Sequence, residues 1–150
     1  MWPLGNRSKP YGRTGGIVTI GVQGIVFDQD RRVLLVRHRY VTGWHFPGGG
    51  VERRETLTEA LARELKEETG IVLIEPAQLF GIYAHFDEFP GDHIALFVAN
   101  GWERPRMPGL NAEIAAQDFF ALDQLPLSTT EATKRRLREV LTGVERNTTW

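Results

Sequence analysis

The chain has 150 residues, a formal net charge of −1 and no cysteine. This length suits one domain with its own core, and the lack of cysteine excludes disulfides, thiolate-bound metals and a thiol nucleophile. Near-neutral charge disfavours nucleic acid as the main partner. Apolar runs are too short for a membrane span, and the N-terminal stretch lacks an apolar signal segment. We therefore expect a cytoplasmic enzyme or binding module, with a homodimer left open.

The N-terminal half predicts strands. Residues 1–16 are rich in glycine, proline and cations, which indicates a loose arm or an edge hairpin. The apolar stretches 17–27 and 31–37 flank a short polar turn at 28–30, and this pattern predicts a β-hairpin. Residues 44–46 predict a further short strand that ends at a proline.

A glycine run and a long helix follow. Gly48–Gly50 predicts a loop with unrestricted backbone geometry. Residues 56–69 contain neither glycine nor proline and favour a helix. Thr56 and Glu59 have the spacing of a capping box, and Gly70 stands where a C-terminal glycine is expected.

The C-terminal half adds more strands and a second helix. The strand candidates are 71–74, 79–86, 94–99 and 119–122. A helix over 128–141, capped by Ser128 or Thr129, would complete a domain over 17–141, with 142–150 as a tail. This order is not a strict strand–helix alternation, so it predicts a mixed β-sheet packed between helices, an α+β arrangement.

The first predicted helix would carry carboxylates inside its apolar stripe. At about 100° per residue, Glu68 falls among Leu57, Leu61 and Leu65, and Glu64 lies at the edge of that stripe. Runs of glutamate on helices are usually solvated, but burying a lone carboxylate costs several kcal/mol unless it is paired or binds a metal.

A divalent cation would resolve this crowding. Glu64, Glu67 and Glu68 repel one another, and Arg63 can offset one of them through an Arg63–Glu67 pair. Oxygen-only ligands favour Mg²⁺ or Mn²⁺ over zinc. The upstream glycines would bring backbone groups close to the same ligand, so the two features together indicate a metal–phosphate site.

These residues also spell a known motif. Gly49, Glu55 and the run from Arg63 to Ile71 resemble the complete Nudix box, G-x5-E-x7-R-E-U-x-E-E-x-G-U with U aliphatic. The resemblance implies an α/β/α sandwich and a divalent-metal hydrolase. By motif position, the expected metal ligands are the Gly48 carbonyl, Glu64, Glu67 and Glu68, with Glu55 acting through water. Arg63 would orient the glutamates.

The implied reaction is hydrolysis of a pyrophosphate bond in a nucleoside diphosphate linked to another group, by water attack at phosphorus. The resemblance implies a general base either in the box or on a later loop. Many relatives carry a glutamate three residues before the late aromatic pair, where this chain has Ala116. Glu113 and Asp118 are candidate loop carboxylates, and Glu64 is our expected base.

Substrate contacts are less sharply indicated. Arg37, His38 and Arg39 form a basic cluster at the end of a predicted strand and could reach phosphates, and Trp44 could stack on a base. His85 and His93 lie in an acidic connection and are expected to be exposed histidines. The main alternative is a non-catalytic nucleotide-sensing module with the same fold. The prenyl-diphosphate isomerase branch of the fold usually relies on a cysteine, which this chain lacks.

Overall fold

The computed structural model describes residues 16–88, 90–109 and 113–150. Its elements in chain order are β1 (Thr19–Val26), β2 (Val33–His38), β3 (Trp44–His45), β4 (Gly48–Gly50), α1 (Leu57–Thr69), β5 (Val72–Leu73), β6 (Gln78–Ala84), β7 (Asp92–Ala99), β8 (Trp102–Glu103), β9 (Ile114–Phe120) and α2 (Glu131–Thr142). Most of the predicted N-terminal arm, residues 1–15, lies outside the described residues. No helix in the described ranges is long and apolar enough to cross a membrane.

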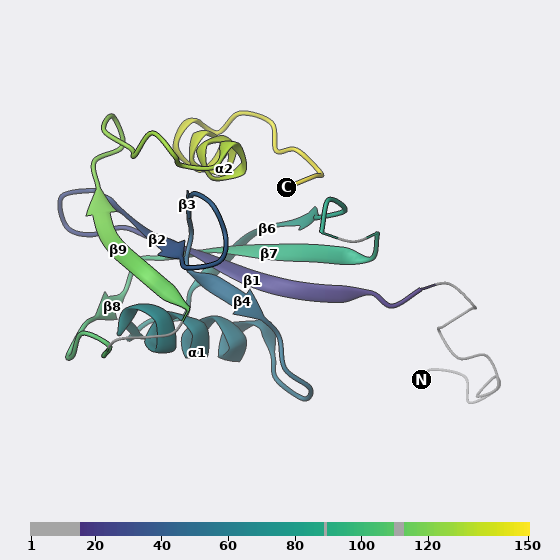
Figure 1. The fold of residues 1–150 in the computed structure, drawn as a ribbon, viewed down its shortest axis with the longest axis horizontal. Helices are drawn as coiled ribbons and strands as arrows, with labels where there is room; N and C mark the ends of the chain where they lie inside the picture. Colours follow the sequence, from purple (N-terminus) through teal and green to yellow (C-terminus); the bar gives the residue numbers. More distant parts are fainter. Residues whose placement is uncertain (1–15, 89, 110–112) are drawn as a thin grey trace, which may run out of the picture.

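The strands form a central layer with one helix on each side (Figure 1). One sheet has the order β4-β1-β7-β6, a second has the order β3-β2-β9, and β5 pairs with β8. β1 and β7 are parallel, whereas the other ladders are antiparallel. The predicted mixed sheet between helices, and with it the α/β/α sandwich, is confirmed.

β1 and β2 do not form the predicted hairpin. The turn exists, because Asp28 Oδ1 accepts a hydrogen bond from the backbone N–H of Arg32 at 2.8 Å. After the single bridge between Phe27 and Val33, however, β1 joins β4 and β7 while β2 joins β3 and β9. All four residues Val33–Val36 are 0% exposed, so β2 needs cover on both faces, which a two-stranded hairpin cannot provide.

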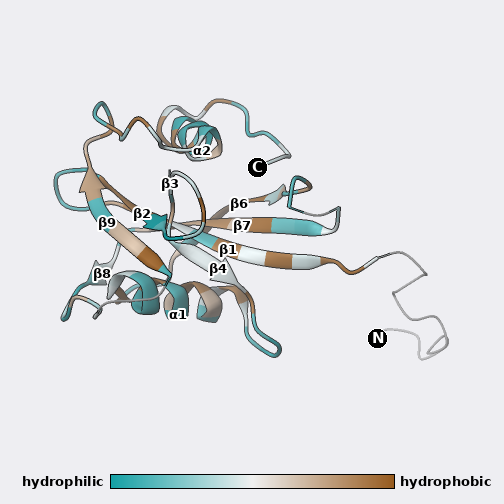
Figure 2. Cartoon of the chain, viewed as in Figure 1, coloured by the Kyte–Doolittle hydropathy of each residue, from teal (hydrophilic) through white to brown (hydrophobic). Residues whose placement is uncertain are grey.

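Hydrophobic residues recur along β1, β7 and β9 (Figure 2), and buried side chains form two clusters, one against each helix. The cluster against α1 includes Val22, Leu34, Leu61 and Leu65. The cluster against α2 includes Ile25, Val33, Leu35 and Leu137. Successive residues of β2 therefore face α1 and α2 in turn, which decides the side on which later residues of that strand project.

Helix α1 begins and ends where the sequence predicts. The Thr56 hydroxyl accepts from the Glu59 N–H at 3.2 Å, and the Glu59 carboxylate accepts from the Thr56 N–H at 2.8 Å. Gly70 ends the helix with φ of 74°, and its N–H donates to the Lys66 carbonyl. These caps, worth about 1 kcal/mol each, fix the start of α1 and hence the direction of each glutamate on it.

Two predicted boundaries were wrong. The N-cap of α2 is Thr130 rather than Ser128 or Thr129, because the Ser128 carbonyl and the Thr130 N–H pair with the backbone of Trp44 and hold this segment extended. β9 begins at Ile114, well before the predicted 119–122, since its first residues also pair with β2, through a register shift between Arg37 and His38.

The residues after α2, predicted as a tail, pack back on β6. The Ala84 N–H donates to the Thr148 carbonyl at 2.8 Å, and the Trp150 N–H donates to the Ala84 carbonyl at 2.9 Å. The Trp150 ring meets the Tyr83 ring edge-on at 5.6 Å. The C-terminal segment therefore extends the edge of the β4-β1-β7-β6 sheet.

Candidate active site

The glycine segment β4 lies directly against β1 and α1. Gly48 pairs with Gln23, where a Cβ atom on Gly48 would lie 2.8 Å from the Gln23 Cα. A Cβ atom on Gly49 would lie 2.5 Å from the Glu64 Cδ. Both distances are shorter than real Cβ atoms approach. The β1 backbone therefore requires glycine at position 48, whereas a side chain at position 49 would displace the Glu64 carboxylate.

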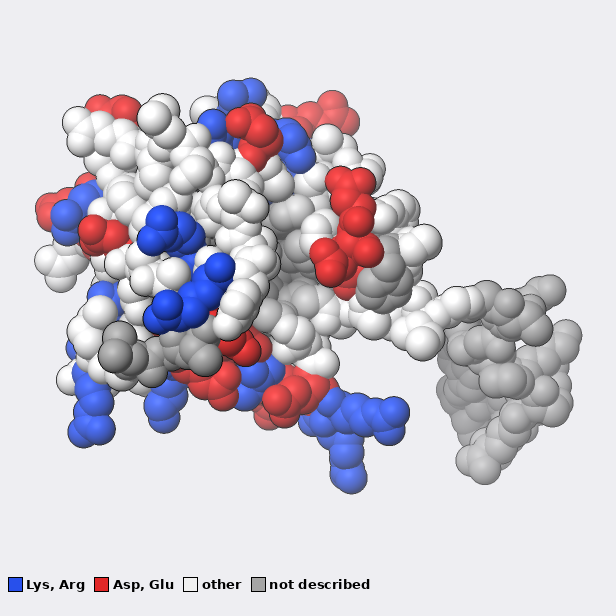
Figure 3. All heavy atoms as spheres, in the orientation of Figure 1, with Lys and Arg blue, Asp and Glu red and all other residues white. Residues whose placement is uncertain are grey.

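Three glutamates of α1 approach this segment to different degrees. The side chain of Glu68 is 4% exposed, that of Glu64 is 15% exposed and that of Glu67 is 60% exposed. Glu68 Oε2 accepts a hydrogen bond from the Gly48 N–H at 3.0 Å, which ties α1 to β4. Acidic and basic side chains lie side by side over α1, and the tip of the loop before it is basic (Figure 3). Glu68 is thus buried, as the helical wheel predicts.

Arg63 joins these carboxylates into one network. Its Nε and one terminal nitrogen donate to the two oxygens of Glu55, at 2.8 and 3.0 Å. The other terminal nitrogen donates to Glu64 Oε1 at 2.7 Å and lies 3.5 Å from Glu67 Oε2. A further hydrogen bond reaches the Gly50 carbonyl at 2.9 Å. One guanidinium therefore fixes the positions of several carboxylates and of the β4 backbone.

The charges of the network shift its proton equilibria in opposite directions. Hydrogen bonds from Arg63 lower the pKa of Glu55 to about 2. Burial raises the pKa of Glu64, the Arg63 hydrogen bond opposes this, and the nearby charges of Glu68 and Glu67 raise it further. Burial thus disfavours the charged form of Glu64, the neighbouring carboxylates add to this, and a cation beside Glu64 would oppose both effects.

Two histidines complete the buried end of the network. His38 Nε2 lies 3.4 Å from Glu68 Oε1, and the His38 and His45 rings are 4.6 Å apart. The contact with Glu68 raises the pKa of His38, whereas burial lowers that of His45. Sequence reasoning grouped His38 only with its basic neighbours; the strand alternation that turns it toward α1 was the available signal.

The predicted substrate contacts are not all on the same side. Arg37 projects toward the α2 side of β2, where its guanidinium lies 5.6 Å from the centre of the Trp44 ring. Trp44 in turn packs edge-on against Phe120 at 4.9 Å. Arg39, beyond the end of β2, instead lines a cavity of about 180 Å³ together with Glu68. The structure thus brings Arg39, but not Arg37 or Trp44, to the box glutamates.

The two expected loop carboxylates lie in different surroundings. Asp118 is within β9 rather than in a loop, and its Oδ1 accepts from the Phe119 N–H at 2.8 Å. Gln117 Nε2 donates to the Glu68 carbonyl at 2.9 Å, so Asp118, the next residue of the strand, projects from the opposite face. Glu113 lies nearer the network: its carbonyl accepts from the Arg39 N–H at 2.8 Å.

The chain is similar to known proteins in both sequence and fold. The profile of the NUDIX domain matches residues 18–141. The chain belongs to the Nudix family. A crystal structure of a MutT Nudix hydrolase from Burkholderia pseudomallei superposes with a TM-score of 0.70 at 31% identity, covering 83% of this chain and 99% of the other.

Two curated relatives extend the comparison. An ADP-ribose pyrophosphatase from Methanocaldococcus jannaschii is 33% identical over 112 residues, which cover 71% of this chain and 64% of that protein. An RNA pyrophosphohydrolase from Halorhodospira halophila is 38% identical over 84 residues, which cover 56% of this chain and 37% of that protein. The Nudix chain thus matches less than two thirds of the length of either relative.

The Nudix box residues fit a hard divalent cation by their chemistry. Their donors are carboxylate and carbonyl oxygens, which suit Mg²⁺ or Mn²⁺. Gly48 and Gly49, which we call the glycine cradle, leave no room for a further side chain beside Glu64. In the described ranges, no three His, Asp or Glu side chains already converge as a metal site. Oxygens of Glu64 and Glu68 are instead directed to Arg63 and to the Gly48 N–H.

A cleft of about 600 Å³ opens beside the glycine segment. It follows β1 from Gln23 to Thr19 and is bordered by His38, His45 and the β6–β7 connection. Apolar side chains and a few polar groups line it, which is typical of small-molecule sites. The cleft therefore offers a substrate-sized space next to the carboxylate network.

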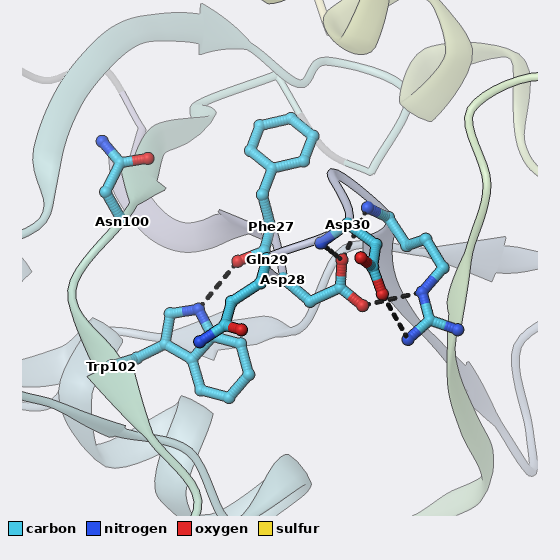
Figure 4. Close-up of a pocket in the computed structure, with 7 residues that line it drawn as sticks. Phe27, Asp28, Gln29, Asp30, Asn100 and Trp102 are labelled. Carbon is cyan, nitrogen blue, oxygen red and sulfur yellow. Dashed lines mark hydrogen bonds and ion pairs between the residues drawn. The ribbon is translucent and has the colours of Figure 1, made fainter.

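A second pocket, of about 480 Å³, lies at the opposite end of β1 (Figure 4). There Trp102 Nε1 donates to the Phe27 carbonyl at 2.8 Å, and Asp28 pairs with Arg32 at 2.7 Å. Asp28 and Trp102 thus have partners within this pocket, and none of the residues that line it belongs to the Nudix box. We therefore assign the candidate site to the first cleft.

Proposed function

We propose that this protein hydrolyses a pyrophosphate bond in a nucleoside diphosphate linked to another group, with Mg²⁺ or Mn²⁺ as cofactor and water as the nucleophile. The observation that carries this proposal is the cluster of carboxylates beside a substrate-sized cleft, with Glu64 and Glu67 at Arg63 and Glu68 at the Gly48 N–H. The names of the two curated relatives, a pyrophosphatase and a pyrophosphohydrolase, support the same reaction class.

Each box residue has a role in this proposal. Glu64, Glu67, Glu68 and the Gly48 carbonyl would hold the cation, and Glu55 would act on it through water. When bound, such a cation neutralises phosphoryl oxygens and lowers the pKa of a coordinated water. Arg63 keeps the carboxylates apart from one another in fixed directions, so little reorganisation is needed when substrate arrives.

Glu64 is our proposed general base. A base works best when its pKa lies near the working pH, and burial raises the pKa of Glu64 toward that range. Its carboxylate also lies against Gly49, at the border of the cleft. Glu113 is the alternative on the later segment, whereas the outward direction of Asp118 does not support it.

Arg39 is our proposed phosphate contact. It shares a cavity with Glu68, and an arginine can bind phosphate oxygens through two parallel hydrogen bonds. The positions of Arg37 and Trp44 support a structural pair beneath α2 instead.

The experiment is a turnover screen of nucleoside triphosphates, ADP-ribose, nucleotide sugars and dinucleoside polyphosphates in Mg²⁺ or Mn²⁺. We expect metal-dependent release of a nucleoside monophosphate from at least one class, and its loss in Glu64→Gln. Tight nucleotide binding without turnover in either metal would instead identify a sensing module and overturn the proposal.

A further inference from the structure

Thr19, Asp92 and His85 form a hydrogen-bonded chain at the end of the cleft that is far from the Nudix box. The proposed hydrolysis at the box assigns no role to these residues. The Thr19 hydroxyl donates to Asp92 Oδ1 at 2.6 Å, and Asp92 Oδ2 lies 2.9 Å from His85 Nδ1. Thr19 and Asp92 are neighbours in the β1–β7 ladder, and the His85 N–H donates to the Asp92 carbonyl at 2.9 Å. Both the backbone and the ring of His85 are therefore held by Asp92.

The position of Asp92 sets the tautomer of His85. A carboxylate can only accept, so in the neutral imidazole the proton is on Nδ1 and Nε2 keeps its lone pair. The His85 side chain is 27% exposed and that of Asp92 is 15% exposed, and both line the cleft. The arrangement thus presents one oriented acceptor nitrogen at the cleft.

The hydrogen-bonded chain of Thr19, Asp92 and His85 is separated from the Nudix box along β1. Gly48 pairs with Gln23, and Thr19 is four residues earlier on the same strand, roughly 13 Å away at about 3.3 Å per residue. With the diphosphate at the box, one end of an extended substrate lies near His85, and we assign the nucleoside to that end. Another polar atom along the cleft, Gln23 Oε1, is buried without a hydrogen-bond partner among the described residues.

We propose that His85 is a specificity-determining residue. Its Nε2 accepts a hydrogen bond from an N–H or O–H group on the base or ribose, and Asp92 and Thr19 are positioning residues that fix its tautomer and direction. This inference rests on the proposed function, because the distance argument places the diphosphate at the Nudix box. A site that hydrogen-bonds a substrate group discriminates against an analogue that lacks it, since the buried partner is then left unpaired.

Two substrate pairs separate the sources of the donor. GTP and ITP differ by the exocyclic amine of the base, and ATP and dATP differ by the ribose 2′ hydroxyl. We expect the wild-type protein to favour the donor-bearing member of one pair in kcat/KM by about tenfold. His85→Ala should remove that preference by raising KM with little change in kcat, and Asp92→Asn should reproduce part of the loss.

His93 provides the matched control. It is the neighbour of Asp92 on β7, its ring meets Phe86 at 5.7 Å, and it does not line the cleft. His93→Ala should keep the substrate preference. If the preference were lost through a general loosening of the β6–β7 connection, His93→Ala would lose it as well. Equal kcat/KM for both members of each pair in wild type, or an unchanged preference and KM in His85→Ala, would overturn the assignment.

A binding measurement keeps the test separate from the proposed function. In nitrogen-15 spectra of the full chain, His85 should show the Nδ1-protonated tautomer, and GMP or AMP should shift its Nε2 signal. If no compound is turned over but this signal shifts, the proposed hydrolysis fails while the His85 contact holds. If both monophosphates leave the signal in place while the enzyme turns over, the His85 inference alone fails.

Discussion

The substitution Gly49→Ala tests the carboxylate network with a single methyl group. The added Cβ would lie 2.5 Å from the Glu64 Cδ, whereas ordinary contacts begin at 3.4 Å, so the carboxylate must move by about 1 Å. A displacement of this size at a reacting centre costs about 10²-fold in rate. We therefore expect metal-dependent kcat/KM to fall by about two orders of magnitude.

The fold should tolerate the same change. The clash is with the end of a flexible side chain, whose off-rotamer displacement costs about 1 kcal/mol. Gly49 is not among the described glycines with positive φ, so alanine fits the backbone and restricts the unfolded chain, which returns about 0.4–1 kcal/mol. Stability in urea unfolding should stay within about 1 kcal/mol of wild type.

Gly50→Ala is the matched control for metal binding. Nothing lies within 4 Å of a Cβ at Gly50, so the shift of melting temperature that Mn²⁺ produces in wild type should persist there and shrink in Gly49→Ala. A Gly49→Ala protein with wild-type turnover and the full Mn²⁺ shift would refute the placement of Glu64 at the reacting centre.

Three further changes probe other parts of the structure. Without metal, Glu68→Gln should melt at the wild-type temperature or above, because one of the crowded charges is gone, but Mn²⁺ should no longer raise its melting temperature. Glu59→Gln keeps the capping box and should retain the Mn²⁺ shift. Arg63→Lys cannot reproduce the two-point contact to Glu55 and should lower kcat/KM by about 10–100-fold with unchanged circular dichroism; an unaltered rate would contradict the orienting role. Burial and the Glu139 contact raise the pKa of Tyr83 to about 12, so its neutral form stabilises the fold below pH 10 and about 2–3 kcal/mol is lost between pH 10 and 12. Urea unfolding should show a shallower alkaline loss in Tyr83→Phe, and equal losses would refute this.

Local signals predicted the part of the site that lies on one element. The capping pair Thr56 and Glu59 and the C-terminal Gly70 fix α1, and once the helix is fixed its period alone places Glu68 in the buried stripe. For these features of α1, sequence neighbours are also spatial neighbours. The glycine run Gly48–Gly50 is different: we predicted a loop, whereas it forms β4, because its backbone pairs with β1, a distant segment of the chain.

Contacts between distant segments could not be predicted in this way. Asp92 and Thr19 meet only because β1 and β7 are parallel neighbours, and nothing near His85 in the sequence identifies that pairing. The β1–β2 hairpin was wrong for the same reason: the turn was correctly placed, but the partners of each strand come from elsewhere in the chain. The sides occupied by Arg37 and His38 likewise follow from which face of β2 meets α1.

The buried ion pair beneath the C-terminal segment gives the largest expected effect on stability. Arg136 is 0% exposed and Glu139 is 5% exposed, with Arg136 Nε 2.9 Å from Glu139 Oε2, an oxygen that also accepts from the Tyr83 hydroxyl at 2.9 Å. Glu139→Gln keeps the shape but leaves a buried guanidinium without its counter-charge, which costs about 3–5 kcal/mol. Urea unfolding should show this loss, whereas removing the exposed Glu131–Lys134 pair of the same helix with Glu131→Gln should change little, because solvent screens it. If the two substitutions change the free energy of unfolding equally, the charge of Arg136 is stabilised by groups other than Glu139, and the argument fails.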